Sequence, residues 1–348
     1  MGTNLMEVFM TTIRAIDTGF GNTKFSMCGT RNPGGLVCHT FPSLVSEPGK
    51  GAAGAEVIGG KRNTVQVQVD GQVYEVGPDV EQLMGHRDAR SLHRDYAKTN
   101  EYMALTRGAL YYMNVPEIDL LVLGLPVNAG ESRYKDLKAR MTGVHDLDGT
   151  RQVNVKNVMV VAQPIGGFAD YAWQKGILQA INDEVNLLID VGFFTLDWVV
   201  AKGSQPVGTR CGAYDAGVSE VLSRVNAAIR KDLDCDDISM NRLDQGLRKG
   251  EIRLFGKTYP MGPFVEEASS AIEEGLNTLQ AKVGATDDID NIFLCGGGAE
   301  LYTSAIRARF PRHEVVSVIE PVMANVRGFQ LLGELATPKS AATKGVAA

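Results

Sequence analysis

Two aspartates, each followed by a glycine two residues later, are the residues of this sequence best suited to chemistry. Asp17 opens the segment Asp-Thr-Gly-Phe-Gly, and Asp190 opens Asp-Val-Gly-Phe-Phe 173 residues further on. Turns of this kind expose backbone N–H groups without side-chain bulk and can bind phosphate oxygens, so Gly19, Gly21 and Gly192 form candidate phosphate sites. Two carboxylates that converge from opposing turns suit Mg²⁺ and its waters, because this cation prefers oxygen ligands.

Polar residues follow both aspartates. Lys24 lies seven residues after Asp17, where the chain returns from the turn, and is placed to neutralise a β- or γ-phosphate. Thr195 and Asp197 occupy the matching region after Asp190. Each feature also has an ordinary interpretation, since such turns are common in hairpins and a single lysine is typical of a solvated surface. Their joint occurrence in duplicated positions favours a nucleotide site.

A third glycine-rich turn consists of Gly296, Gly297 and Gly298, between the apolar segment 291–295 and a predicted helix over residues 299–310. Its open backbone would admit a flat base or a ribose, and the N-terminus of the helix favours anions. The same glycines are also compatible with a tight strand-to-helix connection that binds nothing.

The elements that position these residues repeat. Residues 13–17 form an apolar segment, then the turn, then an alternating segment over 23–28, which predicts a hairpin and not a strand-to-helix phosphate loop. Residues 186–190 and 195–202 repeat this pattern in the second half. The repeat predicts two similar mixed α/β domains that face each other across a cleft, where ligands commonly bind.

The remaining periodicity predicts further strands and helices. The strands are expected at residues 36–45, 64–69, 72–76, 118–127, 153–162, 291–295 and 314–319. The helices are expected at residues 100–114, 131–141, 167–181, 213–233, 263–283, 299–310 and 323–335, with a flexible loop over 49–60.

Composition excludes several classes of protein. The chain has 348 residues, 35 Lys and Arg against 41 Asp and Glu, and a formal net charge of −6, which argues against a general polyanion binder. Its five cysteines are scattered without a C-x-x-C pair, which predicts free thiols, a cytoplasmic location and no zinc site. No long apolar run predicts a membrane span, and the first residues do not resemble a signal peptide.

The combination of two Asp-x-Gly hairpins with a later Gly-Gly-Gly turn before a helix resembles the actin/Hsp70/sugar-kinase superfamily of ATPases. Residues 17–24 resemble its first phosphate motif, residues 190–198 its second, and residues 294–300 its adenosine motif. The Thr-x-Asp-Trp ending of the second motif and the segment Ala-Asn-Val-Arg-Gly at 324–328 are most similar to the actin-like plasmid segregation proteins of the ParM/StbA group. The resemblance runs from about residue 13 to residue 335.

The resemblance implies an α/β, actin-like fold of two ribonuclease-H-like domains, each a mixed five-stranded sheet with flanking helices, around a nucleotide cleft. The implied division is a first domain over residues 13–165, with a small inserted subdomain near 36–98, and a second domain over 166–322. A C-terminal helix at 323–336 would return to the first domain. Residues 1–12 would form an arm and residues 337–348 a disordered tail.

The resemblance also implies roles for individual residues. Asp17 and Asp190 would hold Mg²⁺ and orient its waters, and Gln163 would orient the water that attacks ATP; a polar residue that caps the next helix is the alternative for Gln163. Glu220 is either a ribose hydroxyl acceptor or part of a solvated helix face. The implied ATP/ADP-binding residues are Gly19, Gly21, Asn22, Thr23, Lys24, Gly192, Thr195, Asp197, Glu220, Gly296, Gly297 and Gly298.

The implied function is a filament-forming ATPase in which Mg²⁺-dependent ATP hydrolysis controls self-association, with DNA contacted only through an adaptor protein. Phe193 and Phe194 depart from the small or polar residues usual after the second-motif glycine, so they must point away from the phosphates or pack against a neighbour. A small-molecule kinase is the first alternative, with Asp170 or Asp197 as its base. A nucleotide sensor that does not polymerise is the second, and a chaperone-type ATPase is disfavoured because no β-rich module follows residue 335.

Overall fold

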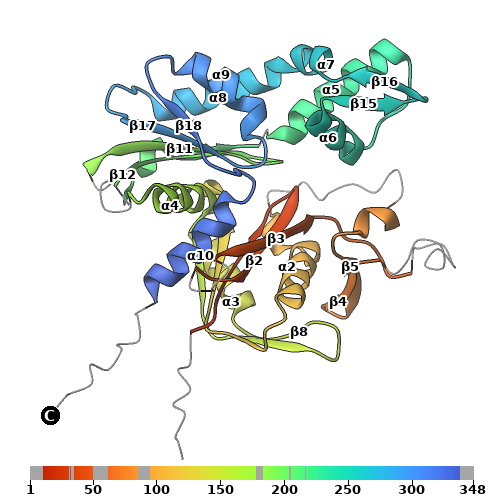
Figure 1. The fold of residues 1–348 in the computed structure, drawn as a ribbon, viewed down its shortest axis with the longest axis vertical. Helices are drawn as coiled ribbons and strands as arrows, with labels where there is room; N and C mark the ends of the chain where they lie inside the picture. The colour runs from red at the N-terminus through yellow and green to blue at the C-terminus, as the bar shows by residue number, and fades with distance from the viewer. Residues whose placement is uncertain are drawn as a thin grey trace, which may run out of the picture.

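The computed structural model describes residues 11–30, 32, 35–49, 62–84, 95–177, 183–203, 205–215 and 217–337. Most of the predicted N-terminal arm, of the loop predicted over 49–60 and of the predicted tail lies outside these residues. The described chain forms two α/β bodies, one above the other in Figure 1, each built around its own central sheet.

The first sheet has five strands and contains the first predicted hairpin. Across the sheet they are β10 (Val158–Ala162), β7 (Leu120–Leu125), β1 (Ile13–Thr18), β2 (Asn22–Cys28) and β3 (Val37–Pro42). β1 pairs antiparallel with β2, which places Asp17 opposite Lys24, and parallel with β7. Because β7 is buried on both faces, its sequence is a continuous apolar run and does not alternate.

Helices cover both faces of this sheet. Ile16, Leu121 and Leu123 pack in one core with helix α2 (Asn100–Met113), and helix α3 (Glu131–Met141) contributes to the same core. The side chain of Thr99 caps α2 by accepting a hydrogen bond from the backbone N–H of Tyr102. The smaller elements of this body are β4 (Val65–Val69), β5 (Gln72–Val76), β6 (Glu117–Ile118), β8 (Gly143–Asp146), β9 (Gln152–Val155) and the 3-10 helices η1 (Val80–Leu83), η2 (Tyr96–Lys98) and η3 (Val127–Ala129).

The second sheet has six strands instead of the five predicted. Its order is β13 (Gln205–Pro206), β12 (Leu196–Lys202), β11 (Val185–Val191), β17 (Asn291–Cys295) and β18 (Val315–Ser317), and β14 (Gly212–Tyr214) also pairs with β12. β11 and β12 are antiparallel, as the hairpin pattern predicts, with Asp190 opposite Asp197. The two Asp-x-Gly segments therefore occupy equivalent positions, each at the end of the first strand of a hairpin.

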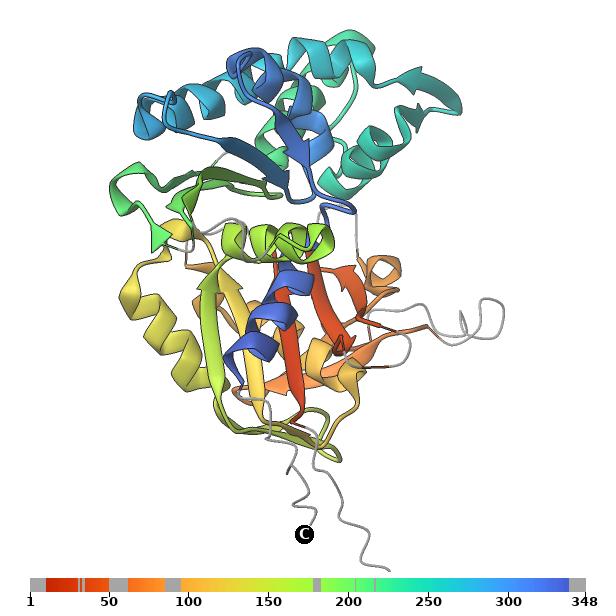
Figure 2. The same ribbon diagram turned by 60° about the vertical axis from the view of Figure 1, so that its left-hand side comes forward.

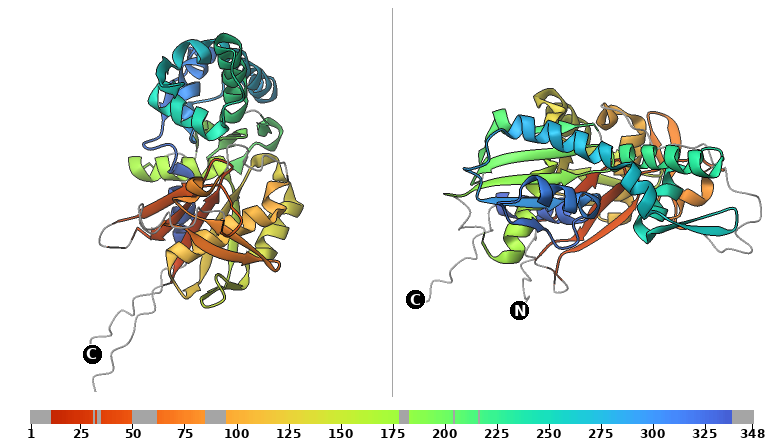
Figure 3. Two further views of the ribbon diagram at one scale, coloured as in Figure 1. Left: turned by 90° about the vertical axis from the view of Figure 1, so that its right-hand side faces the viewer. Right: turned by 90° about the horizontal axis from the view of Figure 1, so that it is seen from above.

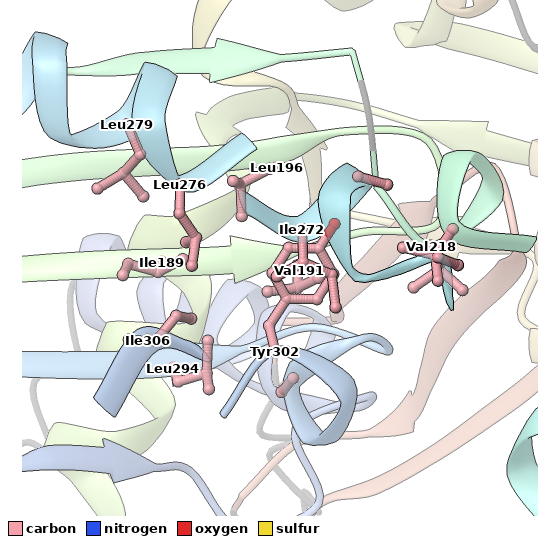
Figure 4. Packing of buried hydrophobic residues seen from close by; sticks show 14 of the residues in the cluster. Ile189, Val191, Leu196, Val218, Ile272, Leu276, Leu279, Leu294, Tyr302 and Ile306 are labelled. Carbon is pink, nitrogen blue, oxygen red and sulfur yellow. The ribbon is translucent and has the colours of Figure 1, made fainter. Parts of the chain in front are cut away.

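Alternate residues of β11 point to opposite faces of the second sheet. Ile189 and Val191 enter a large core with Leu276 and Tyr302 of the outer helices (Figure 4), whereas Leu188 faces the other way. Seen from above, these helices lie over the sheet (Figure 3). The helices and the remaining hairpin of this body are η5 (Gly208–Arg210), α5 (Val218–Leu233), α6 (Met240–Lys249), β15 (Glu251–Leu254), β16 (Lys257–Pro260), α7 (Gly262–Glu267), α8 (Ser269–Val283) and α9 (Ala299–Arg309).

Two helices that cross each other join the bodies: α4 (Gln163–Lys175) and α10 (Ala324–Ala336) (Figures 1 and 2). The backbones touch where they cross, because a Cβ atom on Gly328 would lie 1.8 Å from the carbonyl oxygen of Gly166. α4 packs beneath the second sheet, and α10 lies on the face of the first sheet that carries Ala15 and Val122. The C-terminal helix of the described chain thus completes the body that its first strand begins.

The predicted strand over 153–162 and the predicted helix over 167–181 differ from the structure. The strand is divided into β9, which joins β6 and β8, and β10, which joins the main sheet. α4 begins at Gln163 and not at residue 167, because Pro164 is well suited to the first turn of a helix.

Three further differences lie in the second half. The helix predicted over 213–233 begins only at Val218, since residues 212–214 pair with β12. The helix predicted over 263–283 is divided at Ala268 into α7 and α8. α6 and the β15–β16 hairpin were not predicted, and α6 buries only Leu243 and Gly246, so its apolar periodicity is short. No helix in the described part of the chain is both long enough and apolar enough to cross a membrane.

Candidate functional site

The two Asp-x-Gly turns face each other and touch. A Cβ atom on Gly21 would lie 3.0 Å from Cβ of Phe193 in the opposite turn. The rings of Phe20 and Phe194 lie with their centroids 4.8 Å apart, and Phe20 also stacks on Tyr96 at 4.6 Å. The two phenylalanines that depart from the usual second motif therefore pack against the first turn, across the junction of the two bodies.

Asp17 is almost fully buried at the end of β1, and a neighbour holds each of its carboxylate oxygens. Lys24 donates from Nζ to Oδ2 at 2.8 Å, forming an ion pair across the β1–β2 hairpin. Gln163, the first residue of α4, donates from Nε2 to Oδ1 at 2.8 Å. The carboxylate is thus fixed in direction and partly neutralised, and a lysine and an amide stand beside it.

Asp190 is 5% exposed and lies at the matching end of β11. Asn325 of α10 donates from Nδ2 to its Oδ2 at 2.6 Å. Its Oδ1 lies against Gly296, and a Cβ atom at that position would come within 2.1 Å of this oxygen. The φ of +89° at Gly296 also favours glycine. Burial raises the pKa of the Asp190 carboxyl to about 6, the bond from Asn325 opposes this rise, and the nearby charge of Asp17 adds to it.

A cavity of about 50 Å³ lies between the two turns. Most of the predicted site residues line it: Asp17, Gly19, Gly21, Asn22, Lys24, Gln163, Asp190, Gly192, Thr195, Gly296 and Gly297. Both carboxylates, the lysine and all three glycine-rich turns therefore meet at one place.

Thr23 and Gly298 were predicted to bind nucleotide but do not line the cavity. The buried Thr23 hydroxyl is hydrogen-bonded to Oγ of Ser43 at 2.9 Å, and that Oγ donates to the carbonyl of Gly19 at 2.5 Å. The N–H of Gly298 donates to the carbonyl of Val191 at 2.9 Å. Thr23 and Gly298 are thus hydrogen-bonded within the protein and stabilise the first and third glycine-rich turns, whose other residues face the cavity.

Asp197 and Glu220 also lie outside the cavity lining. Asp197 is 1% exposed and accepts a 2.8 Å hydrogen bond from the backbone N–H of Val127, which ties the second sheet to η3 of the first body. Burial raises the pKa of the Asp197 carboxyl to about 7. Glu220 lies on α5 with its side chain 41% exposed and accepts a 3.1 Å hydrogen bond from Nε of Arg224.

Several residues that line the cavity were missing from the predicted site. They are Phe20, Phe193, Val218, Arg248, Val322 and Asn325. Asn325 lies in the segment at 324–328 that supports the family resemblance, but the sequence assigned it no role. Arg248 lies on the unpredicted helix α6, so no local pattern pointed to it.

The donor set suits a phosphate group with a divalent cation. Two carboxylates and an amide supply hard oxygen atoms, and Lys24 with the glycine backbones supplies positive charge and N–H donors. The described residues contain no cluster of three or more His, Cys, Asp or Glu side chains that could hold a metal alone. A cation here would be bound by the two aspartates and completed by phosphate oxygens and waters, as is usual for Mg²⁺.

Two family models match the chain in succession. The model of the N-terminal domain of actin-like proteins matches residues 15–166, and the model of the C-terminal domain of archaeal, MreB-like actin homologues matches residues 188–308. The chain belongs to the actin-like superfamily. The first match contains Asp17, Lys24 and Gln163, and the second contains Asp190 and the third glycine-rich turn.

Solved structures with the same fold cover 94% of this actin-like chain. The archaeal actin homologue Ta0583 is 18% identical, is covered over its whole length and gives a TM-score of 0.74. Its complex with ADP gives 17% identity, the same coverage and a TM-score of 0.72. ParM in a 15-stranded filament from Clostridium botulinum is 20% identical, is also covered completely and gives a TM-score of 0.73. A search of curated protein sequences finds no match.

Proposed function

We propose that this actin-like protein binds ATP with Mg²⁺ between its two bodies, hydrolyses it slowly, and assembles into filaments whose stability depends on the bound nucleotide. One observation carries the proposal: the carboxylates of Asp17 and Asp190, from equivalent hairpins of the two bodies, line a single cavity with Lys24 and the glycine turns. The ADP complex of the archaeal homologue and the ParM filament support nucleotide binding and self-association.

Four residues of the cavity would each contribute one physical function. Asp17 and Asp190 would hold Mg²⁺, which supplies charge neutralisation at the phosphates when bound. Lys24 is paired with Asp17 at 2.8 Å and would turn its positive charge toward a phosphate oxygen. Gln163 donates to Asp17 through Nε2, which leaves Oε1 as the acceptor that would align a water for in-line attack.

Closure of the two turns is the conformational change that would respond to nucleotide. The contacts between Phe20 and Phe194 and between Gly21 and Phe193 exist only while the turns are together. A nucleotide that binds one arrangement of the bodies more tightly shifts the population toward it, and that arrangement would favour subunit contacts. In this proposal the filament acts in the cytoplasm to segregate plasmid DNA through an adaptor protein, since the net charge of −6 does not suit direct DNA binding.

The test is to follow light scattering and phosphate release at micromolar protein after addition of ATP and Mg²⁺, with negative-stain microscopy of the same samples. We expect scattering to rise, filaments to form and phosphate to be released. ADP should give less polymer, and chelation of Mg²⁺ should abolish phosphate release. A flat scattering trace without filaments, across salt and protein concentrations, would contradict the polymer; nucleotide binding without turnover would indicate a sensor.

A small-molecule kinase is the second candidate, and one observation favours it. A cavity of about 160 Å³ adjoins the cavity between the two Asp-x-Gly turns. The two cavities share Gln163 and Thr195, and the larger one also includes Asp215. The two bases suggested by the sequence support this candidate less, because Asp170 is held by Arg327 at 2.7 Å and Asp197 by Val127 at 2.8 Å. Acceleration of ATP turnover by a sugar or a small acid would favour the kinase over the filament.

A further inference from the structure

Asn325, near the start of α10, is a buried polar residue at the cavity for which the proposed chemistry gives no role. Its side chain is 5% exposed and lines the cavity that contains Asp17 and Asp190. An amide that is buried to this extent costs folding free energy unless its donor and acceptor groups are both used. The partners of this amide therefore indicate what it does.

The partners fix which way the amide points. The backbone N–H of Gly167 donates to Oδ1 of Asn325 at 3.1 Å, and the Cys295 thiol approaches the same oxygen at 3.8 Å. Since a backbone N–H is only a donor, the oxygen of the amide must face Gly167, and Nδ2 must face the carboxylate. Nδ2 then donates to Oδ2 of Asp190 in a short hydrogen bond of 2.6 Å.

The other carboxylate oxygen of Asp190 has a defined place as a result. Oδ1 fits into the space left by the missing side chain of Gly296. With Oδ2 bonded to Asn325 and Oδ1 against Gly296, the carboxylate is restricted to one rotation about its side chain. Asn325 and Gly296 come from α10 and from the turn after β17, so the two restraints are independent.

The helix that carries Asn325 is itself firmly anchored. Arg327 of α10 donates from Nε to both oxygens of Asp170 on α4 at 3.0 Å. Phe329 of the same helix is fully buried against Ala15 of β1, in the first sheet. The orientation of Asp190, which belongs to the second body, is therefore set by a helix packed on the first.

We propose that Asn325 is a positioning residue that acts through Asp190: its amide holds this carboxylate in the one orientation from which it contacts a nucleotide-bound divalent cation. The inference rests on the proposed function, since it concerns the same site. It predicts that loss of the amide reduces the gain in nucleotide affinity that Mg²⁺ provides, while nucleotide binding without the cation changes little.

The test uses the full chain and a fluorescent ATP analogue, whose dissociation constant is measured by anisotropy with Mg²⁺ and with EDTA. Asn325→Leu keeps the branched shape of the side chain but removes the amide. Gln330→Leu is the matched control, because Gln330 is a buried amide on the same helix that bonds to Ser26 and to the carbonyl of Ile13. Thermal melting identifies any variant that does not fold, and Asn325→Ser then serves as the milder change.

We expect the dissociation constant in EDTA divided by that with Mg²⁺ to fall at least about tenfold in Asn325→Leu, as for loss of a hydrogen bond to a charged group. The same ratio should stay unchanged in Gln330→Leu. If Asn325 acts only through Asp190, Asn325→Leu has no further effect in an Asp190→Asn background. An unchanged ratio in Asn325→Leu, or full additivity with Asp190→Asn, would overturn the inference. Failure of the unaltered protein to bind the analogue at all would instead overturn the proposed function.

Discussion

Replacement of Phe194 by alanine tests whether the contact between the turns controls nucleotide exchange. Phe194 and Phe20 belong to opposite hairpins, and their rings lie 4.8 Å apart between centroids with planes inclined at 50°. Such an aromatic pair contributes about 0.5–1.5 kcal/mol beyond the area that it buries. Since about 1.4 kcal/mol changes an equilibrium tenfold, Phe194→Ala should shift the balance of closed and open turns toward the open form by about twofold to tenfold.

The assay is stopped-flow release of a fluorescent nucleotide into excess unlabelled ATP. We expect Phe194→Ala to release nucleotide about two to ten times faster than the unaltered protein, because the closed arrangement must open first. Phe20→Ala should have an effect of similar size, since it removes the same pair of rings, whereas the stack of Phe20 on Tyr96 lies within the first body. The double variant isolates the pair: its effect should be smaller than the sum of the single effects. Unchanged release in Phe194→Ala, or full additivity of the two changes, would refute the reasoning.

Three further predictions concern catalysis, stability and pH. Asp190→Ala should still bind nucleotide but release phosphate far more slowly, and turnover like that of the unaltered protein would remove Asp190 from the mechanism. Gly328→Ala should lower the free energy of unfolding in urea by about 1–3 kcal/mol, because its Cβ would lie 1.8 Å from the Gly166 carbonyl and this clash exceeds the gain in helix propensity. Asp197→Asn should stabilise the protein increasingly between about pH 4 and pH 7, by up to about 1.4 kcal/mol per pH unit, with no further gain above pH 7. The folded protein raises the pKa of Asp197 to about 7, so ionisation of this carboxyl in this pH range favours unfolding. Asparagine cannot ionise but keeps an oxygen that accepts the hydrogen bond from the Val127 N–H. Melting curves of both proteins at several pH values check this.

The turns could be predicted from the sequence because their signals are local. An apolar strand, an Asp-x-Gly turn and a returning strand lie within 16 residues in the first hairpin (13–28) and 18 in the second (185–202), and the structure confirms both hairpins. The duplication of this pattern also placed the two sheets correctly. The strand β14 escaped prediction because it is only three residues long and precedes a helix whose periodicity extended over it.

The hydrogen bonds of Asn325 to Asp190 and of Gln163 to Asp17 could not be predicted, because these two partners come from distant parts of the chain, unlike Lys24. Asn325 lies 135 residues beyond Asp190, and Gln163 lies 146 residues beyond Asp17. Neither contact leaves a periodic pattern, since each depends on where a helix begins after the whole fold has assembled. The sequence predicted that Phe193 and Phe194 either point away from the phosphates or pack against a neighbour, but it did not identify the first turn as that neighbour.

The position of α10 has a consequence for synthesis of the protein. The strand β1 is among the first described segments to leave the ribosome, yet Ala15 of this strand stays uncovered until Val326 and Phe329 of α10 pack on it. The second sheet and its outer helices, by contrast, span a continuous stretch of chain from β11 to β18. We therefore expect the nascent chain to complete its later half first and to finish its earlier half only when translation has passed α10.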